Sequence, residues 1–179
     1  MVQVNCPISS KVKIFSANEV VEKMNWGIKT LGISKLWKET KGENIKVLVL
    51  DTGACELHPD LKGAIKRVRN FTDSPTNKDC DGHSTHVSGI IGARENGIGV
   101  IGIAPKCDIY IGKVLNDSGQ GFNSWVANGI RWGIEIGVDI INLSLGSSVG
   151  DNNLYSAIKE AYKKNIAVVC AVGNEGVVE

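Results

Sequence analysis

The sequence has 179 residues, of which 42% are apolar and 22% charged, and its formal net charge is +1 at pH 7. This length and composition suit one domain with a real core and argue against intrinsic disorder. The near-neutral charge, with basic residues in short separate clusters, argues against a nucleic-acid partner. No apolar run approaches the roughly 20 residues that a membrane span needs, so no membrane partner is expected.

The cysteines and the N-terminus indicate the cellular compartment. The five cysteines are widely spaced and include no Cys-x-x-Cys pair, which argues against a disulfide framework and against a zinc site. The first residues lack the apolar core of a signal peptide. We therefore expect a cytoplasmic protein in a reducing environment.

The first 25 or so residues are more mixed in composition than those that follow. We expect residues 1–25 to form an N-terminal extension and residues 26–179 to form the domain. Ser16, with Glu19 three residues later, predicts a helix cap for residues 16–24. The segment GISKLWKETKG predicts a short helix that ends at Gly42.

From residue 44 onward, short apolar runs alternate with amphipathic segments. The runs are rich in Val and Ile and nearly continuous, which is typical of strands covered on both faces; they lie at residues 45–51, 107–115, 138–145 and 166–172. Apolar residues at three- and four-residue steps predict helices near 122–134 and 154–162. The alternation predicts an α/β fold with a mostly parallel sheet flanked by helices.

Asp51 ends the first of these runs, in the sequence Asp-Thr-Gly. Such a stretch fits an aspartic protease, in which two loops bring two carboxylates around one proton. It also fits the end of a buried strand in a Ser-His-Asp hydrolase, or a plain turn. The α/β pattern and the single Asp-Thr-Gly weigh against the aspartic protease, although a homodimer could supply a second loop.

Two further polar residues occur where strands or loops end. His83 lies between Gly82 and Ser84, just before an apolar helix, where a histidine is more often a surface or capping residue. A carboxylate bonded to one ring nitrogen would make it a general base. Asn174 follows the last apolar run beside Gly173 and could donate to an oxyanion, although Gly-Asn also suits an ordinary turn.

In this order, the three segments resemble the subtilisin-like serine proteases (subtilases, peptidase S8 family), in particular the bacterial intracellular subtilisins. The resemblance implies a three-layer subtilisin-like fold and a serine endopeptidase in which Asp51 and His83 belong to an Asp-His-Ser triad and Asn174 serves the oxyanion hole. It also implies a groove that binds an extended peptide or protein substrate by strand addition. The implied groove residues are Ser118, Gly119, Gln120, Ser144, Leu145 and Gly146; a polar turn after a strand would explain the last three without function.

The resemblance further implies a structural calcium ion. Asp60 would bind it together with the side-chain oxygen of Asn96 and the backbone carbonyls of Arg94, Ile98 and Val100. Oxygen-only ligands suit Ca²⁺. The plain alternative is a polar surface turn with Asn-Gly at its tip.

The sequence departs from the family pattern in two ways. Ser84 stands where the family has glycine after the histidine. The segment that carries the nucleophilic serine in a Gly-Thr-Ser turn is not found after Asn174, so we expect the C-terminal portion of the fold to be missing. Three explanations stay open: a fragment of an active protease, a partner that is a C-terminal complementing chain, or a catalytically dead peptide-binding pseudoprotease.

The N-terminal extension has a possible function of its own. The resemblance to intracellular subtilisins implies that residues 1–25 lie across the active site until they are removed, with Pro7 resisting cleavage because proline has no backbone N–H. A simple disordered terminus is the alternative.

Overall fold

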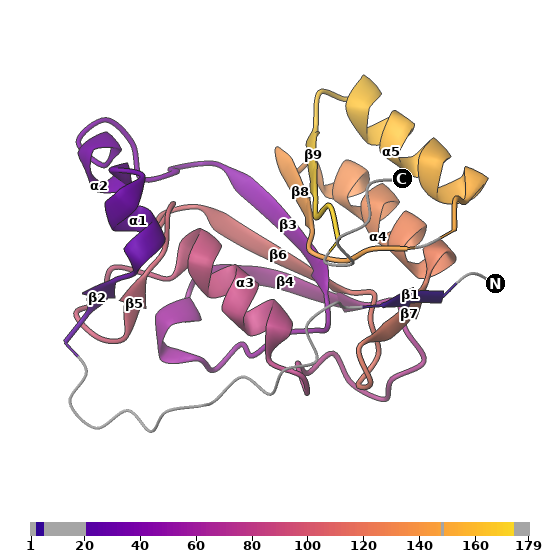
Figure 1. Ribbon diagram of the computed structural model, residues 1–179, viewed down its shortest axis with the longest axis horizontal. Helices are drawn as coiled ribbons and strands as arrows, with labels where there is room; N and C mark the ends of the chain where they lie inside the picture. Colours follow the sequence, from indigo (N-terminus) through magenta and orange to yellow (C-terminus); the bar gives the residue numbers. More distant parts are fainter. Residues whose placement is uncertain (1–2, 6–20, 148, 174–179) are drawn as a thin grey trace.

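The computed structural model describes residues 3–5, 21–147 and 149–173. Its central sheet has the strand order β4-β6-β3-β8-β9, and neighbouring strands are parallel (Figure 1). The strands are β4 (Ile65–Asn70), β6 (Asp108–Lys113), β3 (Lys46–Asp51), β8 (Ile140–Leu143) and β9 (Ala167–Cys170). The predicted parallel α/β sheet is therefore confirmed.

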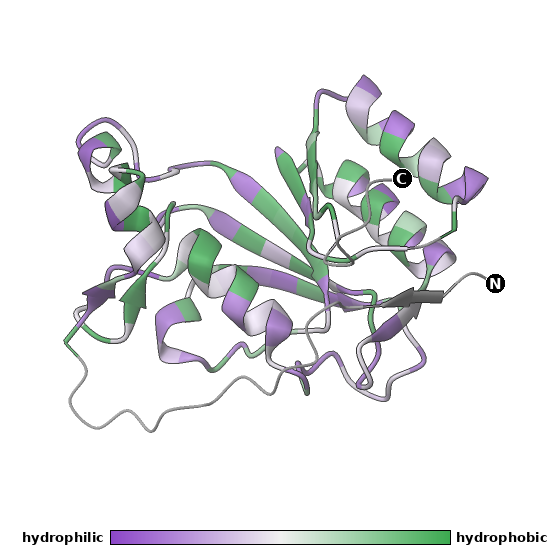
Figure 2. Ribbon diagram, in the orientation of Figure 1, coloured by the Kyte–Doolittle hydropathy of each residue, from purple (hydrophilic) through white to green (hydrophobic). Residues whose placement is uncertain are grey.

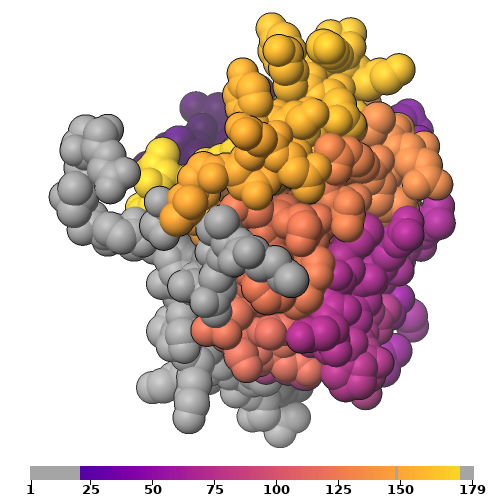
Figure 3. All heavy atoms as spheres, turned by 90° about the vertical axis from the view of Figure 1, so that its right-hand side faces the viewer, coloured from indigo at the N-terminus to yellow at the C-terminus, as the bar shows by residue number. Residues whose placement is uncertain are grey.

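Helices cover both faces of this sheet and complete three layers. On one face lies α3 (His83–Gly92), and on the other lie α4 (Asn123–Ile136) and α5 (Asn152–Lys163) (Figure 1). The space-filling view shows the yellow residues of α5 packed on the orange residues of α4 (Figure 3). In the described part of the chain, no helix is long and apolar enough to cross a membrane.

Strand β3 shows why its sequence is apolar without alternation. Val47 and Val49 pack into the cluster on the α3 side, whereas Leu48 and Leu50 pack into the cluster under α4 and α5. Successive side chains of a strand point to opposite faces, and both faces are buried here. Figure 2 shows the apolar strands lying between the helices.

Local signals set the ends of the helices on the α4 side. Helix α4 ends at Gly137, which adopts the left-handed conformation that favours glycine. Helix α5 begins after Asp151, whose side chain accepts a hydrogen bond from Leu154 N at 2.8 Å. Ala157 and Ala161 turn to the core, and the charged residues of α5 face solvent.

The N-terminal region differs from its prediction. Lys23–Met24 forms β2, which pairs in parallel with β5 (Val100–Ile101), so the end of the predicted helix at residues 16–24 is a strand. Ser16 and Glu19 lie outside the described residues. Helix α1 (Trp26–Thr30) was not predicted, and α2 (Ile33–Leu36) ends earlier than Gly42.

Tertiary contacts explain these differences. Strand β2 exists because it adds to β5, which a local pattern cannot reveal. Trp37, the residue that ends α2, donates its ring N–H to Ile103 O at 2.9 Å. The carboxylate of Glu43 accepts a hydrogen bond from Lys41 N at 2.8 Å, which holds a turn where more helix was predicted.

Other elements were also not predicted. The 3-10 helix η1 (Pro59–Leu61) lies in the chain after β3 and before β4. Strand β7 (Gln120–Phe122) pairs antiparallel with β1 (Gln3–Asn5), in the register Val4 opposite Gly121. Edge strand β4 was not predicted because charged residues interrupt its apolar positions.

Candidate active site

Asp51 lies at the carboxyl end of the central strand β3 and is fully buried. Its backbone carbonyl accepts hydrogen bonds from Val114 N at 2.9 Å and Leu115 N at 3.2 Å. Its carboxylate Oδ1 accepts a hydrogen bond from Thr52 N at 2.7 Å. The position of the carboxylate is therefore fixed by the backbone on both sides.

His83 is the first residue of α3 and is 7% exposed. Its Nδ1 lies 2.8 Å from Asp51 Oδ1 and 2.9 Å from Asp51 Oδ2. An ionised carboxylate only accepts hydrogen bonds, so Nδ1 carries the proton and the other ring nitrogen, Nε2, can act as a base. The two predicted residues, which are 32 positions apart in sequence, thus form a buried acid–histidine pair.

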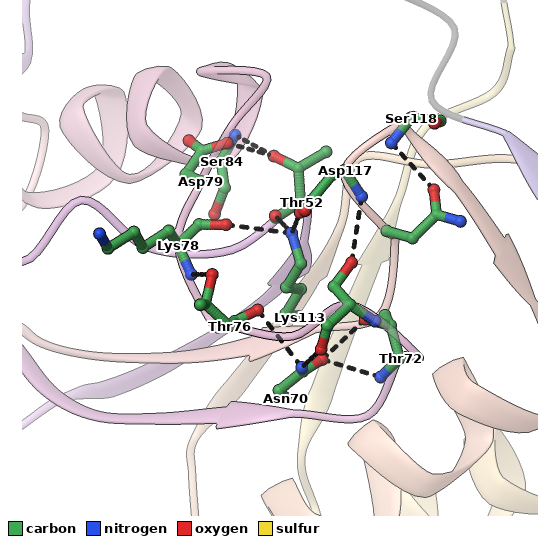
Figure 4. Close-up of polar contacts among 12 residues, drawn as sticks. Thr52, Asn70, Thr72, Thr76, Lys78, Asp79, Ser84, Lys113, Asp117 and Ser118 are labelled. Atoms are coloured by element: carbon green, nitrogen blue, oxygen red, sulfur yellow. Dashed lines mark hydrogen bonds and ion pairs between the residues drawn. The ribbon is translucent and has the colours of Figure 1, made fainter.

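A second aspartate fastens the loop after β3 to the start of α3. Asp79 Oδ1 accepts hydrogen bonds from Thr52 Oγ1 and Gly82 N, both at 2.8 Å, and Oδ2 accepts from Thr85 N at 2.8 Å and Thr85 Oγ1 at 2.5 Å. Thr52 Oγ1 in turn accepts from Ser84 N at 3.1 Å (Figure 4). Asp79 was not predicted from the sequence, although an aspartate shortly before a helix is a capping signal.

The hydrogen bonds decide the ionisation of Asp79. Burial raises the pKa of its carboxyl, but the hydrogen bonds from Thr85, Gly82 and Thr52 outweigh this effect, so the pKa lies below the ordinary value of 3.8. Because hydrogen bonds to the charged form stabilise it, Asp79 stays ionised in the folded protein well into the acid range. Its charge lies at the N-terminal end of α3, where the helix dipole favours an anion.

The Asp79→Ala substitution should lower the free energy of unfolding by about 2 kcal/mol at neutral pH, because it removes a helix cap and leaves several donors unpaired. A depressed folded pKa stabilises the protein above the ordinary carboxyl pKa, and this stabilisation is lost as pH falls through the folded value. The stability difference between wild type and variant should therefore shrink in acid. Urea unfolding at pH 7 and pH 3 measures it, with the exposed Asp73→Ala as control; equal differences at both pH values would contradict the assignment.

Gly53 lets the loop after Asp51 approach the segment before α3. A Cβ at this position would lie 2.6 Å from Lys78 O, and its φ of +131° is unfavourable for other residues. Next to it, Ala54 N donates to Asn77 O at 2.9 Å and Asp79 N donates to Ala54 O at 3.1 Å. The Asp-Thr-Gly sequence thus has one role for each residue: Asp51 bonds His83, Thr52 bonds Asp79, and Gly53 permits close contact.

Comparison with known proteins shows the family of the chain. Residues 42–178 match the model of the Subtilase family. The chain belongs to this family. The aspartic-protease interpretation of Asp51 is therefore wrong: its carboxylate bonds a histidine in a subtilase domain, not a second carboxylate.

Named subtilase relatives match most of the chain. It is 43% identical over 169 residues to the intracellular serine protease of Paenibacillus polymyxa, with 92% of this chain and 52% of that protein aligned. It is 43% identical over 177 residues to the major intracellular serine protease of Bacillus subtilis, with 95% and 54% aligned. Subtilisin E of Bacillus subtilis is 40% identical over 163 residues, with 89% and 42% aligned. The chain thus spans about half the length of these relatives.

Ser84, which departs from the subtilase pattern, is buried at the start of α3. Its backbone N–H bonds Thr52, but its Oγ has no hydrogen-bond partner among the described residues. Gly82, rather than Ser84, occupies the cap position. Ser84 is thus accommodated at this position without capping the helix.

The predicted groove residues of this subtilase domain lie on both sides of Asp51. Strands β6 and β8 flank β3, so the loops at their carboxyl ends also flank it. One loop is a turn at residues 116–120, in which Asn116 Oδ1 accepts from Ser118 N at 3.0 Å and Gln120 N at 3.1 Å. Gly119 has a φ of +71° in this turn.

The second groove segment directly follows β8. Ser144 Oγ accepts a hydrogen bond from Asn142 Nδ2 at 2.9 Å, and Gly146 is half-buried. The side chain of Leu145 packs in the core under α4 and α5, so only its backbone is left for a peptide. Asn174 lies outside the described residues, beyond β9 in the chain.

The predicted calcium residues surround Asp60, which is 5% exposed. Its Oδ2 accepts from Val100 N at 3.0 Å, and Asn96 Nδ2 lies 3.4 Å from its Oδ1. Asn96 Oδ1 accepts from Ile98 N at 3.0 Å, and the Arg94 guanidinium reaches other carbonyls, including Pro105 O. The residues offer suitable oxygens, but hydrogen bonds occupy the side-chain oxygens here. Among the described residues, no group of three or more His, Cys, Asp or Glu side chains could hold a metal.

Proposed function

We propose that this chain supplies the acid–base part of a serine-type endopeptidase and that a serine outside residues 1–179 supplies the nucleophile. The observation that carries the proposal is the buried contact between Asp51 and His83 Nδ1 at the carboxyl end of the sheet. In open α/β sheets, functional groups gather at this end. The names of two relatives support an intracellular site of action.

In this proposal the His83 ring moves the proton. Nε2 takes the proton of the serine hydroxyl as its oxygen attacks the peptide carbonyl, and then gives that proton to the leaving amine. Asp51 holds the ring in the required tautomer and stabilises the transient imidazolium. The side chain of Asn174 would donate a hydrogen bond to the oxyanion. Water then hydrolyses the acyl-enzyme by the same steps in reverse order.

The substrate in this proposal is an extended peptide or protein segment that adds as a strand to the 116–120 turn and β7. Its other side would contact the backbone of residues 144–146. Strand addition uses main-chain hydrogen bonds and therefore suits many sequences. The flanking of Asp51 by β6 and β8 supports this placement.

The test supplies a segment that carries a nucleophilic serine. The chain is produced alone and with the C-terminal part of the Paenibacillus polymyxa relative that lies beyond the match, fused or as a separate chain. We expect the completed protein to hydrolyse a fluorogenic peptide about 10⁶-fold faster than its nucleophile Ser→Ala variant, a factor that is known for subtilisin. It should also react with a fluorophosphonate probe. A folded, completed protein without either activity would refute the proposal.

A second candidate function is a peptide-binding pseudoprotease that never receives a serine. It is supported by the two predicted groove segments, which flank Asp51 and need no serine to hold a peptide backbone. It predicts that the chain alone binds extended peptides without cleaving them. Isothermal titration calorimetry without detectable peptide binding would count against it.

The N-terminal extension is proposed to compete with substrate. Its support is the antiparallel pairing of β1 with β7, which occupies the edge to which a peptide would add. Pro7 lies outside the described residues. Since β2 is part of the fold, the matching variant removes residues 1–20 and should bind peptides more tightly. An unchanged dissociation constant would contradict this role.

Calcium is proposed to bind at Asp60 once the Asn96 amide turns its oxygen inward. The support is chemical: a buried carboxylate faces a loop whose carbonyls and amide supply further oxygens. Millimolar CaCl₂ should raise the melting temperature relative to EDTA in wild type and not in Asp60→Asn. Equal melting temperatures with CaCl₂ and EDTA in wild type would contradict the site.

A further inference from the structure

Lys113 is a fully buried lysine next to the acid–histidine pair. It ends β6, and in the sheet it lies directly opposite Asp51. Lysine is rarely buried completely, because removing an ammonium from water costs several kcal/mol unless partners compensate. The mechanism proposed above gives this cation no role, although it is buried beside the site.

The ammonium of Lys113 bonds three separate loops. Nζ donates to Thr52 O, in the loop after Asp51, and to Lys78 O at 3.1 Å, in the segment before α3 (Figure 4). It also forms an ion pair with Asp117 Oδ1 at 2.9 Å, in the turn at residues 116–120. An ammonium has three N–H donors, and all of them are used here.

The three partners differ in what they position. The Thr52 carbonyl belongs to the residue after Asp51, whose N–H bonds the Asp51 carboxylate. The Lys78 carbonyl precedes Asp79, which holds the start of α3 and with it His83. Asp117 belongs to the turn of the proposed groove, and the hydrogen bond from Lys113 lowers the pKa of its carboxyl.

An apolar side chain could fill the volume of Lys113, but it could not replace the two hydrogen bonds and the ion pair of the ammonium. It would leave the carbonyls of Thr52 and Lys78 without their donor, and a buried unpaired carbonyl is costly. It would also release Asp117, which is partly exposed and on the solvent side of this network. The three loops that Lys113 joins thus account for a cation at this buried position.

We propose that Lys113 is a positioning residue that couples the peptide-binding turn at residues 116–120 to the Asp51–His83 pair. A peptide that orders the turn fixes Asp117, and through the ammonium it fixes the loops that carry Asp51 and precede His83. The peptide-binding half of this inference rests on the proposed function. The link between Lys113 and the acid–histidine pair does not.

The test uses the full chain, without added serine, and three measurements: thermal melting, the proton NMR signal of His83 Nδ1–H, and peptide affinity by calorimetry. Lys113→Met should weaken and shift the His83 signal and lower peptide affinity about tenfold, a change of about 1.4 kcal/mol. Lys113→Arg keeps the charge and should restore part of the His83 signal and part of the peptide affinity. Lys66→Met removes the exposed ion pair to Asp108 and serves as the control. It should leave the His83 signal and the peptide affinity unchanged.

Asp117→Ala keeps the proposal testable if Lys113→Met does not fold. It should lower peptide affinity and abolish the shift of the His83 signal on peptide addition, while the signal of the free protein stays in place. In the completed enzyme, Lys113→Met should lower kcat about 100-fold because it misplaces the catalytic pair, whereas Asp117→Ala should mainly raise KM.

Two results would overturn the coupling. One is a folded Lys113→Met with wild-type His83 signal and wild-type affinity. The other is an Asp117→Ala variant that keeps the peptide-induced shift. An inactive completed enzyme would refute the peptidase proposal but not the role of Lys113, because the His83 signal is measured without a nucleophile.

Discussion

The Asp51→Asn substitution is expected to lower kcat of the serine-completed enzyme by about 10⁴-fold, the effect of this change in an Asp-His-Ser triad. An asparagine has nearly the same shape, but it can present an N–H₂ group where His83 Nδ1–H now donates to the carboxylate. The ring then changes to the tautomer in which Nε2 carries a proton and cannot act as a base. The imidazolium also loses its stabilising negative charge.

Steady-state hydrolysis of a fluorogenic peptide measures this effect. In the chain alone, loss of the hydrogen-bonded Nδ1–H signal by proton NMR should accompany it. Asp108→Asn is the matched control, since Asp108 lies at the opposite end of the neighbouring strand β6 and makes an exposed ion pair. A drop of less than tenfold, in a protein that melts like wild type, would mean that Asp51 does not orient the base.

Gly53→Ala is expected to lower the free energy of unfolding by about 3 kcal/mol. The added Cβ would lie 2.6 Å from Lys78 O and 2.8 Å from Asn77 O, and both are backbone atoms that cannot rotate away. The φ of +131° adds backbone strain for any residue with a side chain. Relief of the clash would push the loop after Asp51 away from the segment that leads to His83.

Gly63→Ala separates the two causes of this loss. Gly63 also has a positive φ, of +76°, but a Cβ there would have no neighbour within 4 Å. Its substitution should therefore lower the free energy of unfolding by about 1 kcal/mol, through backbone strain alone. Urea denaturation of both variants gives the comparison. Equal losses would show that the contact between Gly53 and Lys78 is not tight in solution.

The contacts around Asp51 form one connected network. Thr52, Asp79 and Lys113 each bond the loop after β3 to another segment. The proposed peptidase function therefore depends on residues that would never touch a substrate. Substitutions at these positions are expected to act on the geometry of the acid–histidine pair rather than on peptide affinity alone.

Elements with strong local patterns could be predicted from the sequence. Strand β3 is apolar from Val47 to Leu50, and α4 repeats apolar residues at helical spacing, so both were expected close to their final bounds. Strand β4 could not be predicted, because Arg67 and Arg69 interrupt its apolar residues and it lies at the edge of the sheet. Strand β2 exists only through its pairing with β5.

By itself, the sequence determined the α/β class, the position of Asp51 at the end of a buried strand, and the position of His83 at the start of a helix. Each follows from hydrophobic periodicity or from neighbouring residues, which act locally along the chain. Only the tertiary structure decided that the two side chains meet, that Asp79 supports them and that Lys113 is buried below them. These contacts join positions 27 to 61 residues apart. Which distant residues meet depends on the order of strands in the sheet, and a local pattern does not encode that order.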